Sequence, residues 1–215
     1  MIERGSEFET ALSEAQAKGY AERNPAADVE GYDACRKIAI LSSMAWGGFA
    51  DYNDISTEGI TNITKSDVEL AEKLGYKIKL IGYAQREGDK KAYACVAPML
   101  VKNDILLSEV KDVFNAIMVS GDFLGDAMFF GKGAGKLATA SAVVADIIDM
   151  VKKSNADKFS LLWNEKIEIS NGEDKKWDFF VSDGKSGEII KNVSEKDINK
   201  SEYKSIIKVL PWEQK

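Results

Sequence analysis

The amino-acid sequence predicts an α+β fold, with helices packed on one face of a mostly antiparallel sheet and a small β-rich C-terminal appendage. The first observation is that residues 8–153 combine segments of helical apolar spacing with β-rich runs joined by short turns. The second is a change of sequence pattern over 154–215, where short β-rich segments alternate with Asn-Gly, Asp-Gly and Ser-Gly turns. The third is composition, since 215 residues that are 45% hydrophobic can bury a core. We therefore expect a main domain over 8–153 and a short divergent extension over 154–215.

Helical spacing of apolar residues predicts helices at 8–18, 31–46, 64–74 and 138–151. The first is followed by Gly19, a residue type that commonly ends helices. The third begins at Thr64, which is a favourable N-cap residue. The fourth is strongly apolar, and we interpret its stripe of Val143, Ile147 and Met150 as core.

Runs of β-branched and aromatic residues predict strands at 76–85, 91–96, 114–120 and 127–130, and in the tail within 158–169, 176–181 and 203–210. The first two runs are joined by the turn at 86–89, so they are expected to form a hairpin.

Composition excludes several classes of function. A net charge of -6 argues against a nucleic-acid surface or a polybasic membrane patch, and no apolar run is long enough to span a membrane. The chain has no histidine, which removes Ser-His and Cys-His catalysis and the common zinc sites, so no metal site is predicted. Cys35 and Cys95 are expected to be small core residues rather than a disulfide, which suits the cytoplasm. Residues 1–7 are expected to derive from a cloning site, because Gly-Ser-Glu-Phe at 5–8 is what joined BamHI and EcoRI sites encode.

The stretch at 19–37, GYAERNPAADVEGYDACRK, places ionisable side chains at the start of an apolar helix. Asp33 and Lys37 share one helical stripe with Ile40 and Met44, which predicts that the charged pair points inward. Buried charge is costly unless it is paired and used, so the cluster is a candidate site.

Two interpretations of this cluster are open. A partly desolvated Lys37 could donate a proton to a carbonyl oxygen, because burial brings its pKa toward the working range. The carboxylates of Glu22, Asp28 and Asp33 would hold the lysine or bind an ammonium of a substrate. The alternative is a structural ion network, in which Asp33 pairs with Lys37, Asp28 caps the helix and Glu22 is merely exposed. Spacing alone favours this alternative.

Two further motifs are weaker. The segment GKGAGK at 131–136 lies between a predicted strand and a predicted helix, where glycines and a helix N-terminus favour an anion. Its glycine spacing is neither that of a P-loop nor that of a dinucleotide fingerprint, so a plain turn is favoured. In NAIMVSGD, at 115–122, the Asn and Asp are best interpreted as turn formers.

Together these stretches resemble homoserine dehydrogenase. The resemblance is carried, in order, by 19–37, by EGI at 58–60 with DVELAEKLGYKIKLIG at 67–82, by VFNAIMVSGD at 113–122, and by GKGAGKLATASAVVADIID at 131–149. It implies an enzyme that interconverts L-aspartate 4-semialdehyde and L-homoserine with NADP or NAD, in threonine and methionine biosynthesis. It also implies a homodimer formed through the sheet.

The resemblance assigns roles to individual residues. It implies that Lys37 is the catalytic proton donor, that Glu22 and Asp33 bind the amino acid, and that Asp28 supports the site. Residues against the nicotinamide nucleotide are implied to be Gly19, Gly133, Ala134 and Gly135. The family's Rossmann domain, which provides the main nucleotide pocket, is not recognisable here. We therefore expect this chain alone to be inactive.

Two other interpretations stay open. The chain could be a non-catalytic dimerisation module, or it could belong to a related dehydrogenase that acts on another semialdehyde or amino acid. An enzyme part should leave Glu22, Asp33 and Lys37 lining an open cleft, whereas a pure assembly module would bury or scatter them.

Overall fold

The computed structural model describes residues 7–17, 19, 21–133, 135–152, 163, 165–170, 172 and 174–212. Its helices are α1 (Phe8–Ala17), α2 (Ala26–Val29), α3 (Tyr32–Trp46), α4 (Lys65–Lys73) and α5 (Lys136–Lys152), with short 3-10 turns at Tyr52–Asp54, Leu106–Glu109 and Glu195–Asp197. Its strands are β1 (Ser56–Thr57), β2 (Tyr76–Arg86), β3 (Lys91–Lys102), β4 (Phe114–Gly121), β5 (Gly125–Lys132), β6 (Glu168–Ser170), β7 (Lys176–Ser182), β8 (Gly187–Ser194) and β9 (Ser205–Val209).

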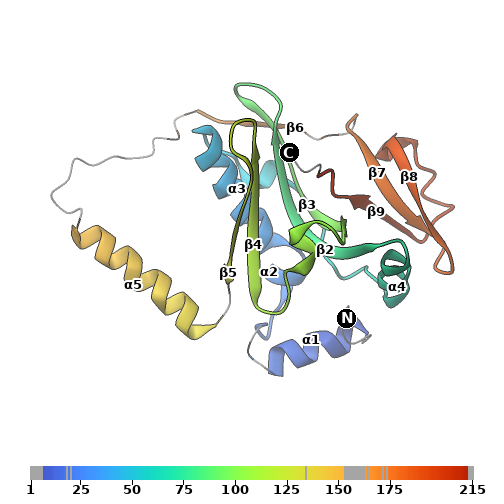
Figure 1. Cartoon of the computed structure of the whole chain (residues 1–215), viewed down its shortest axis with the longest axis horizontal. Coiled ribbons are helices and arrows are strands. Elements are labelled where there is room, and N and C mark those ends of the chain that lie inside the picture. The colour runs from blue at the N-terminus through green and yellow to red at the C-terminus, as the bar shows by residue number, and fades with distance from the viewer. Residues whose placement is uncertain are drawn as a thin grey trace.

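Strand β3 is the centre of the main sheet, in which the strands follow the order β1-β3-β9-β7-β8 while β2 and β6 also pair with β3 (Figure 1). Every residue of β3 between its terminal lysines is buried. A strand that is covered on both faces has a continuous apolar sequence, and ACVAPMLV in this strand has that character.

The C-terminal extension is β-rich as predicted, and its strands add to the sheet of the first part. β6 and β9 both pair with β3 in parallel, while β7 lies between β9 and β8 in antiparallel pairings. β2 and β3 form the predicted antiparallel hairpin, but β1 also pairs with β3 in parallel, so the sheet is mixed. The α+β class is confirmed.

Helices α3 and α4 pack on one face of this sheet. Cys35 and Ala39 of α3 contact Ala94 and Val96 of β3. The backbone of β2 comes close to α3 at Gly82, where an added Cβ would lie 3.2 Å from the Cβ of Ile38. Larger side chains in this contact would push the helix away from the sheet.

Helix α4 begins as the sequence predicts. The amide of Asp67 donates to the hydroxyl of Thr64, and the carboxylate of Asp67 accepts from the amide of Thr64, which completes a capping box. Val68 and Ala71 of this helix pack on Leu100 of β3.

The other face of the sheet carries the largest core cluster. Tyr93 and Met99 of β3 pack there with Trp177 and Phe179 of β7, and Met118 of β4 lies against this cluster. The ribbon of β4 and β5 therefore covers the sheet with one of its faces and leaves the other outward.

Two predicted apolar stripes point outward, and both predictions were wrong. On α3 the buried residues are Cys35, Ala39, Ser42 and Ser43, whereas Ile40 is 52% exposed and Met44 is 57% exposed. Because this helix is apolar nearly all round, the pattern could not select the face that meets the sheet. Small side chains face β2 and β3 because the helix approaches them closely.

Helix α5 is the second correction. Val143 is 53% exposed, Ile147 is 54% exposed and Met150 is 73% exposed, so they are not core residues of this chain. The helix stands apart from the sheet, at the left of Figure 1, and none of its residues is buried. An apolar stripe indicates that a helix face contacts another apolar surface, but it does not identify that surface.

Cys35 and Cys95 are free thiols, and both are buried as predicted. Within the described ranges, no helix combines the length and the apolar character needed to cross a membrane.

The contact of the extension with the first part can be tested at Trp177. This side chain is 4% exposed, and its ring centroid lies 5.4 Å from that of Tyr83 and 5.7 Å from that of Tyr93. We expect Trp177→Ala to lower the free energy of unfolding by about 3–5 kcal/mol, measured by urea denaturation. The control is Phe123→Ala at a fully exposed position, which should change it by less than about 0.5 kcal/mol. Equal effects of the two substitutions would mean that β7 adds nothing to the core.

Candidate active site

Glycines fix the backbone that carries the charged cluster. Gly19 follows α1 with φ +73°, and Gly31 precedes α3 with φ +79°, both in the region that favours glycine. A Cβ on Gly31 would lie 3.1 Å from Cγ1 of Val96, so a side chain there would separate the start of α3 from β3.

The EGI segment holds α2 in place. The amide of Ile60 donates to the carbonyl oxygen of Val29 at 2.8 Å. A Cβ on Gly59 would lie 2.3 Å from the same oxygen, so only glycine permits this approach. The contact positions α2, which carries Asp28, against the chain that leads out of β1.

Asp33 and Lys37 form an ion pair one turn apart on α3, with 2.5 Å between Lys37 Nζ and Asp33 Oδ2. The side chain of Lys37 is 61% exposed and that of Asp33 is 45% exposed, so the prediction that this pair points inward was wrong. Asp33 is the only ionic partner of Lys37 among the residues that the structure describes. The ammonium is therefore held on one side and open to a ligand on the other.

The structure does not bring the other two carboxylates to this lysine. Glu22 and Asp28 are exposed, and within the described chain neither forms an ion pair with Lys37. The loop that carries Glu22 is tied to α1 by a hydrogen bond from Gln16 Nε2 to the carbonyl oxygen of Glu22 at 3.0 Å. No side chain caps α3 at Gly31, so Asp28 does not cap this helix as the structural alternative expects. The other two parts of that alternative, the Asp33–Lys37 pair and the exposure of Glu22, agree with the structure.

Ile40 and Met44 flank the ion pair on its C-terminal side. The sequence pattern assigned them to the core, yet they form an exposed apolar surface on the same stripe as Lys37. The result is a charged pair bordered by apolar side chains, an arrangement typical of a surface that contacts an amphipathic ligand or another protein part.

The glycines of the second motif shape the connection from β5 to α5. An added Cβ on Gly133 would lie 2.1 Å from Nδ2 of Asn115, and Gly135 has φ +113°, so both positions require glycine. Ala134 lies outside the described residues. Gly135 also accepts a hydrogen bond from the amide of Thr139 at the start of α5. These contacts agree with a tight turn and leave anion binding untested.

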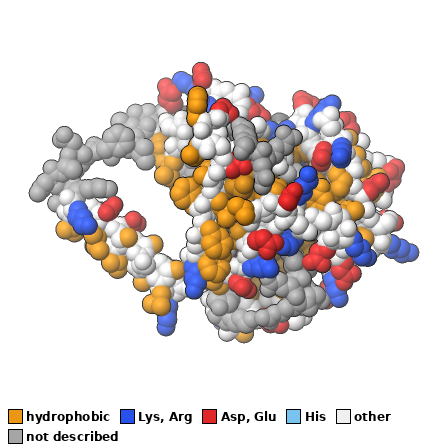
Figure 2. Space-filling view, viewed as in Figure 1, with side chains coloured by type: hydrophobic (Ala, Val, Ile, Leu, Met, Phe, Trp, Pro, Cys, Tyr) orange, Lys and Arg blue, Asp and Glu red, His pale blue; other side chains and the backbone are white. Residues whose placement is uncertain are grey.

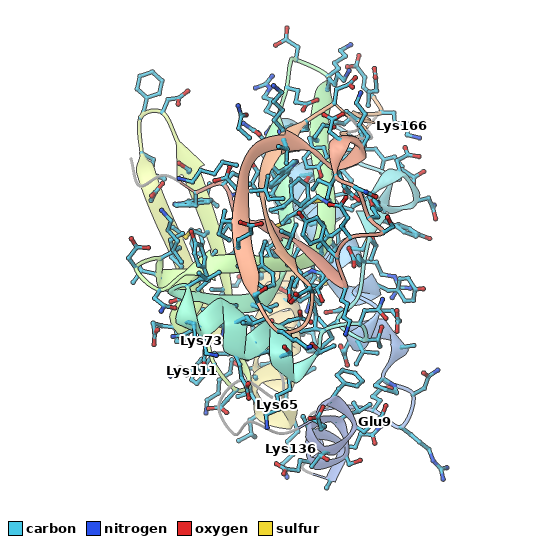
Figure 3. The ribbon with its side chains drawn as sticks, turned by 90° about the vertical axis from the view of Figure 1, so that its right-hand side faces the viewer. Glu9, Lys65, Lys73, Lys111, Lys136 and Lys166 are labelled. Atoms are coloured by element: carbon cyan, nitrogen blue, oxygen red, sulfur yellow. The ribbon has the colours of Figure 1, made fainter. Side chains whose placement is uncertain are left out.

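The two glycine segments adjoin elements at the same end of the molecule. Figure 3 shows Lys136, at the start of α5, near the end that carries Glu9 of α1, with Lys166 at the opposite end. Figure 1 agrees, since α1 and the beginning of α5 both lie at the bottom. Across the residues that the structure covers, no group of three or more His, Cys, Asp or Glu side chains could hold a metal ion.

Comparison with known proteins decides the family. Residues 1–148 match the family model described as homoserine dehydrogenase. The chain belongs to the homoserine dehydrogenase family. The sequence resemblance is thereby confirmed, and it includes the segments that carry Lys37 and the glycines of the β5–α5 connection.

Individual members of the family give the same result. The homoserine dehydrogenase of Pseudomonas aeruginosa is 45% identical over 157 residues, which are 73% of this chain and 36% of that protein. The crystal structure of a homoserine dehydrogenase from Thiobacillus denitrificans matches with a TM-score of 0.77 and 36% identity, over 84% of this chain and 44% of that one. A hyperthermophilic archaeal homoserine dehydrogenase in complex with NADPH matches with a TM-score of 0.54 and 27% identity, over 69% of this chain and 41% of that one. The chain thus spans about 36% of the length of its curated relatives.

Because the Asp33–Lys37 pair is exposed, removal of Lys37 should have a small effect on the stability of the chain. We expect Lys37→Ala to change the free energy of unfolding of this chain by less than about 0.5 kcal/mol, because an exposed i,i+4 pair contributes little in water. Urea denaturation followed by circular dichroism measures this. A loss of several kcal/mol would show that the lysine is a structural residue.

Proposed function

We propose that this chain supplies the substrate-binding and proton-donating half of a homoserine dehydrogenase of threonine and methionine biosynthesis in the cytoplasm. Such an enzyme interconverts L-aspartate 4-semialdehyde and L-homoserine with NAD or NADP. The observation that carries the proposal is the Asp33–Lys37 ion pair on the open face of α3, in a member of this family. Since the chain spans about 36% of its relatives, the main nucleotide surface belongs to the remainder of such an enzyme.

Lys37 is the proton donor in this proposal. As the aldehyde carbon is reduced, negative charge develops on its oxygen, and the ammonium of Lys37 transfers a proton to that oxygen. In the reverse direction the neutral amine accepts the hydroxyl proton of homoserine. Asp33 pairs with the ammonium from the preceding turn of α3 and so keeps it on this face of the helix.

The carboxylates give the substrate its orientation. Both the semialdehyde and homoserine carry an α-ammonium group, which a carboxylate binds through charge-assisted hydrogen bonds. Glu22 and Asp33 are assigned to this group, and Asp28 supports the site from α2. The exposure of Glu22 and Asp28 leaves both carboxylates accessible for this purpose.

The glycines fit a nucleotide that lies against the backbone. Apart from the flanking residues, no heavy atom of the described chain lies within 4 Å of the place where a side chain would stand on Gly19 or Gly135, so a ligand can approach closely there. Gly133, Ala134 and Gly135 precede α5, whose N-terminus favours negative charge. The nicotinamide cofactor supplies the hydride when bound. Support for NADP as the cofactor comes from the archaeal relative that is in complex with NADPH.

A graft tests the catalytic role. Residues 8–148 are placed in the Pseudomonas aeruginosa enzyme in exchange for its matching segment, and reduction of NADP by L-homoserine is followed at 340 nm. We expect the graft to turn over and Lys37→Ala in the graft to lower kcat by at least about 100-fold, because general acid catalysis is lost. The matched control is Lys65→Ala, which removes another i,i+4 pair, with Glu69, on the separate helix α4 and should leave kcat unchanged (Figure 3).

Near-normal kcat in the Lys37→Ala graft would exclude the assignment. A graft that folds and dimerises without turnover would support the dimerisation module, and turnover of a different semialdehyde would support the related dehydrogenase. The 215-residue chain alone should show no turnover and no tight binding of NADPH by calorimetry. Tight binding would contradict the division of labour between the two halves.

The outward face of the β4–β5 ribbon supports a homodimer formed through the sheet. Ile117 is 41% exposed, Val119 is 46% exposed and Phe129 is 67% exposed, and Ile117 lies opposite Phe129 in the register. Figure 2 shows a continuous hydrophobic area over these two strands. A two-stranded ribbon is marginally stable alone, so an apolar face of this kind favours a cover, and a second copy provides a self-complementary one.

Sedimentation of the chain tests the dimer. We expect a dimer at micromolar concentration, and we expect Phe129→Glu to shift it to monomer, because two copies of the charge would be buried at the two-fold interface. The control is Lys185→Glu, a charge reversal at an exposed turn in the extension. A monomeric parent chain, or a variant that still dimerises, would place the interface elsewhere.

A further inference from the structure

A pocket opens along the edge of β3 that pairs with β1 and β9. On this edge of β3, the pairing with β1 ends at Val96 and the pairing with β9 begins at Met99. Ala97 and Pro98 therefore have no strand partner on this side, and Pro98 has no amide hydrogen to offer one. A cavity of about 340 Å³ forms in this gap, which lies within the size range of small-molecule sites.

Both parts of the chain line this cavity. Its lining comprises Glu58, Ile63, Ala97 and Pro98 from the part that matches the family, and Phe179, Glu195, Lys200, Tyr203, Lys204, Ile206, Ile207 and Lys208 from the extension. The extension lies beyond the family match, which ends at residue 148. The pocket is thus a feature that the extension completes.

Two of the lysines share one carboxylate. Glu195 accepts hydrogen bonds from Lys208 at 2.8 Å and from Lys200 at 2.9 Å. Partial burial raises the pKa of Glu195, but these two ion pairs outweigh burial and hold its pKa below the ordinary value. Glu195 therefore stays ionised at neutral pH, and its single negative charge balances half of the positive charge of Lys200 and Lys208.

Glu58 and Lys204 are opposite charges that are not joined to any described residue by an ion pair, although Glu58 feels the charges of Lys208 and Lys200. Among the described residues, neither side chain makes a hydrogen bond or an ion pair, although both line the cavity. Desolvation raises the pKa of the Glu58 carboxyl, while the positive charges of Lys208 and Lys200 oppose that rise. Both side chains are exposed, and a carboxylate and an ammonium that line one cavity complement a ligand that carries both charges.

We infer that this pocket binds a small aliphatic amino acid as its zwitterion, with the ammonium of the ligand against Glu58 and its carboxylate against Lys204. Ile63, Pro98 and Phe179 provide the apolar lining for the aliphatic part. This inference does not depend on the proposed dehydrogenase activity, because none of these residues belongs to the Asp33–Lys37 site.

Two isomeric probes distinguish the spacing of the charges. Calorimetric titration of the 215-residue chain uses L-2-aminobutyrate, an α-amino acid, and 4-aminobutyrate, whose charges are further apart. We expect at least one isomer to bind, and the preferred isomer identifies the spacing. Butyrate and butylamine carry only one of the two charges, so each should bind at least about ten-fold more weakly.

Variants locate the binding. Glu58→Gln and Lys204→Gln should each weaken binding of the preferred isomer by at least about ten-fold. Glu188→Gln and Lys185→Gln make the same changes at exposed positions outside the cavity and should leave affinity unchanged. Asp33→Asn, in the proposed substrate site, should also leave it unchanged, which separates the two sites. Circular dichroism verifies that each variant is folded.

Several outcomes would overturn the inference. They are the absence of binding by either isomer up to about 10 mM, equal binding of butyrate, and affinity that is insensitive to Glu58→Gln. Loss of binding in Asp33→Asn with retention in Glu58→Gln would place the amino acid in the substrate site and reject this pocket. That last result would leave the proposed dehydrogenase function intact.

Discussion

Burial of β3 on both faces is the constraint on which the rest of this structure depends. A strand of this kind must be covered by helices on one side and by further side chains on the other, and both covers are drawn from distant parts of the sequence. α3 and α4 provide the first cover, while Trp177 and Phe179 of β7 provide much of the second. Because β9 and β6 also pair with β3, the strands of the extension are part of the same sheet.

Close backbone contacts place α3, which carries Asp33 and Lys37, directly against β2 and β3. Gly31 lets the first turn of α3 lie against Val96, and Gly82 lets the body of the helix lie against β2. The face of α3 that meets the sheet must consequently be small, which leaves the longer side chains outward. The ion pair of Asp33 and Lys37 is thus displayed on the surface by the same contacts that build the core.

The sequence was most informative where the cause of a structure is local. The capping box at Thr64 and Asp67 depends on four consecutive residues, and the β2–β3 hairpin depends on a short turn between two apolar runs. The strand β8 was not predicted, because its register against β7 shifts at Trp177 and its side chains do not alternate. Asp178 accepts from the amide of Asn192, which has φ +53°, so the irregularity is fixed by a residue fourteen positions away.

The sequence could not predict which way the apolar stripes of α3 and α5 point, and the reason is different. The patterns on α3 and α5 record the need for an apolar contact, but the partner is chosen by the fold or by a surface outside it. Within the candidate site, the pattern predicted the Asp33–Lys37 pair, since four-residue spacing on a helix brings side chains together. It could not place Glu22 and Asp28, whose positions depend on the loop between α1 and α2 and on the contact of Val29 with Ile60.

The exposure of Lys37 bears directly on how the proposed chemistry would operate. In water the attraction between Lys37 and Asp33 is weakened by solvent and by salt, so the pair is held loosely in this chain. A second surface placed over Ile40 and Met44 would exclude water and strengthen the same pair by lowering the local dielectric. The apolar side chains beside the lysine would then seal the reaction from solvent, and the ammonium would meet the aldehyde oxygen in a dry environment. An open ion pair with an apolar border is therefore the form that a proton-donating half should take before its nucleotide-binding half closes over it.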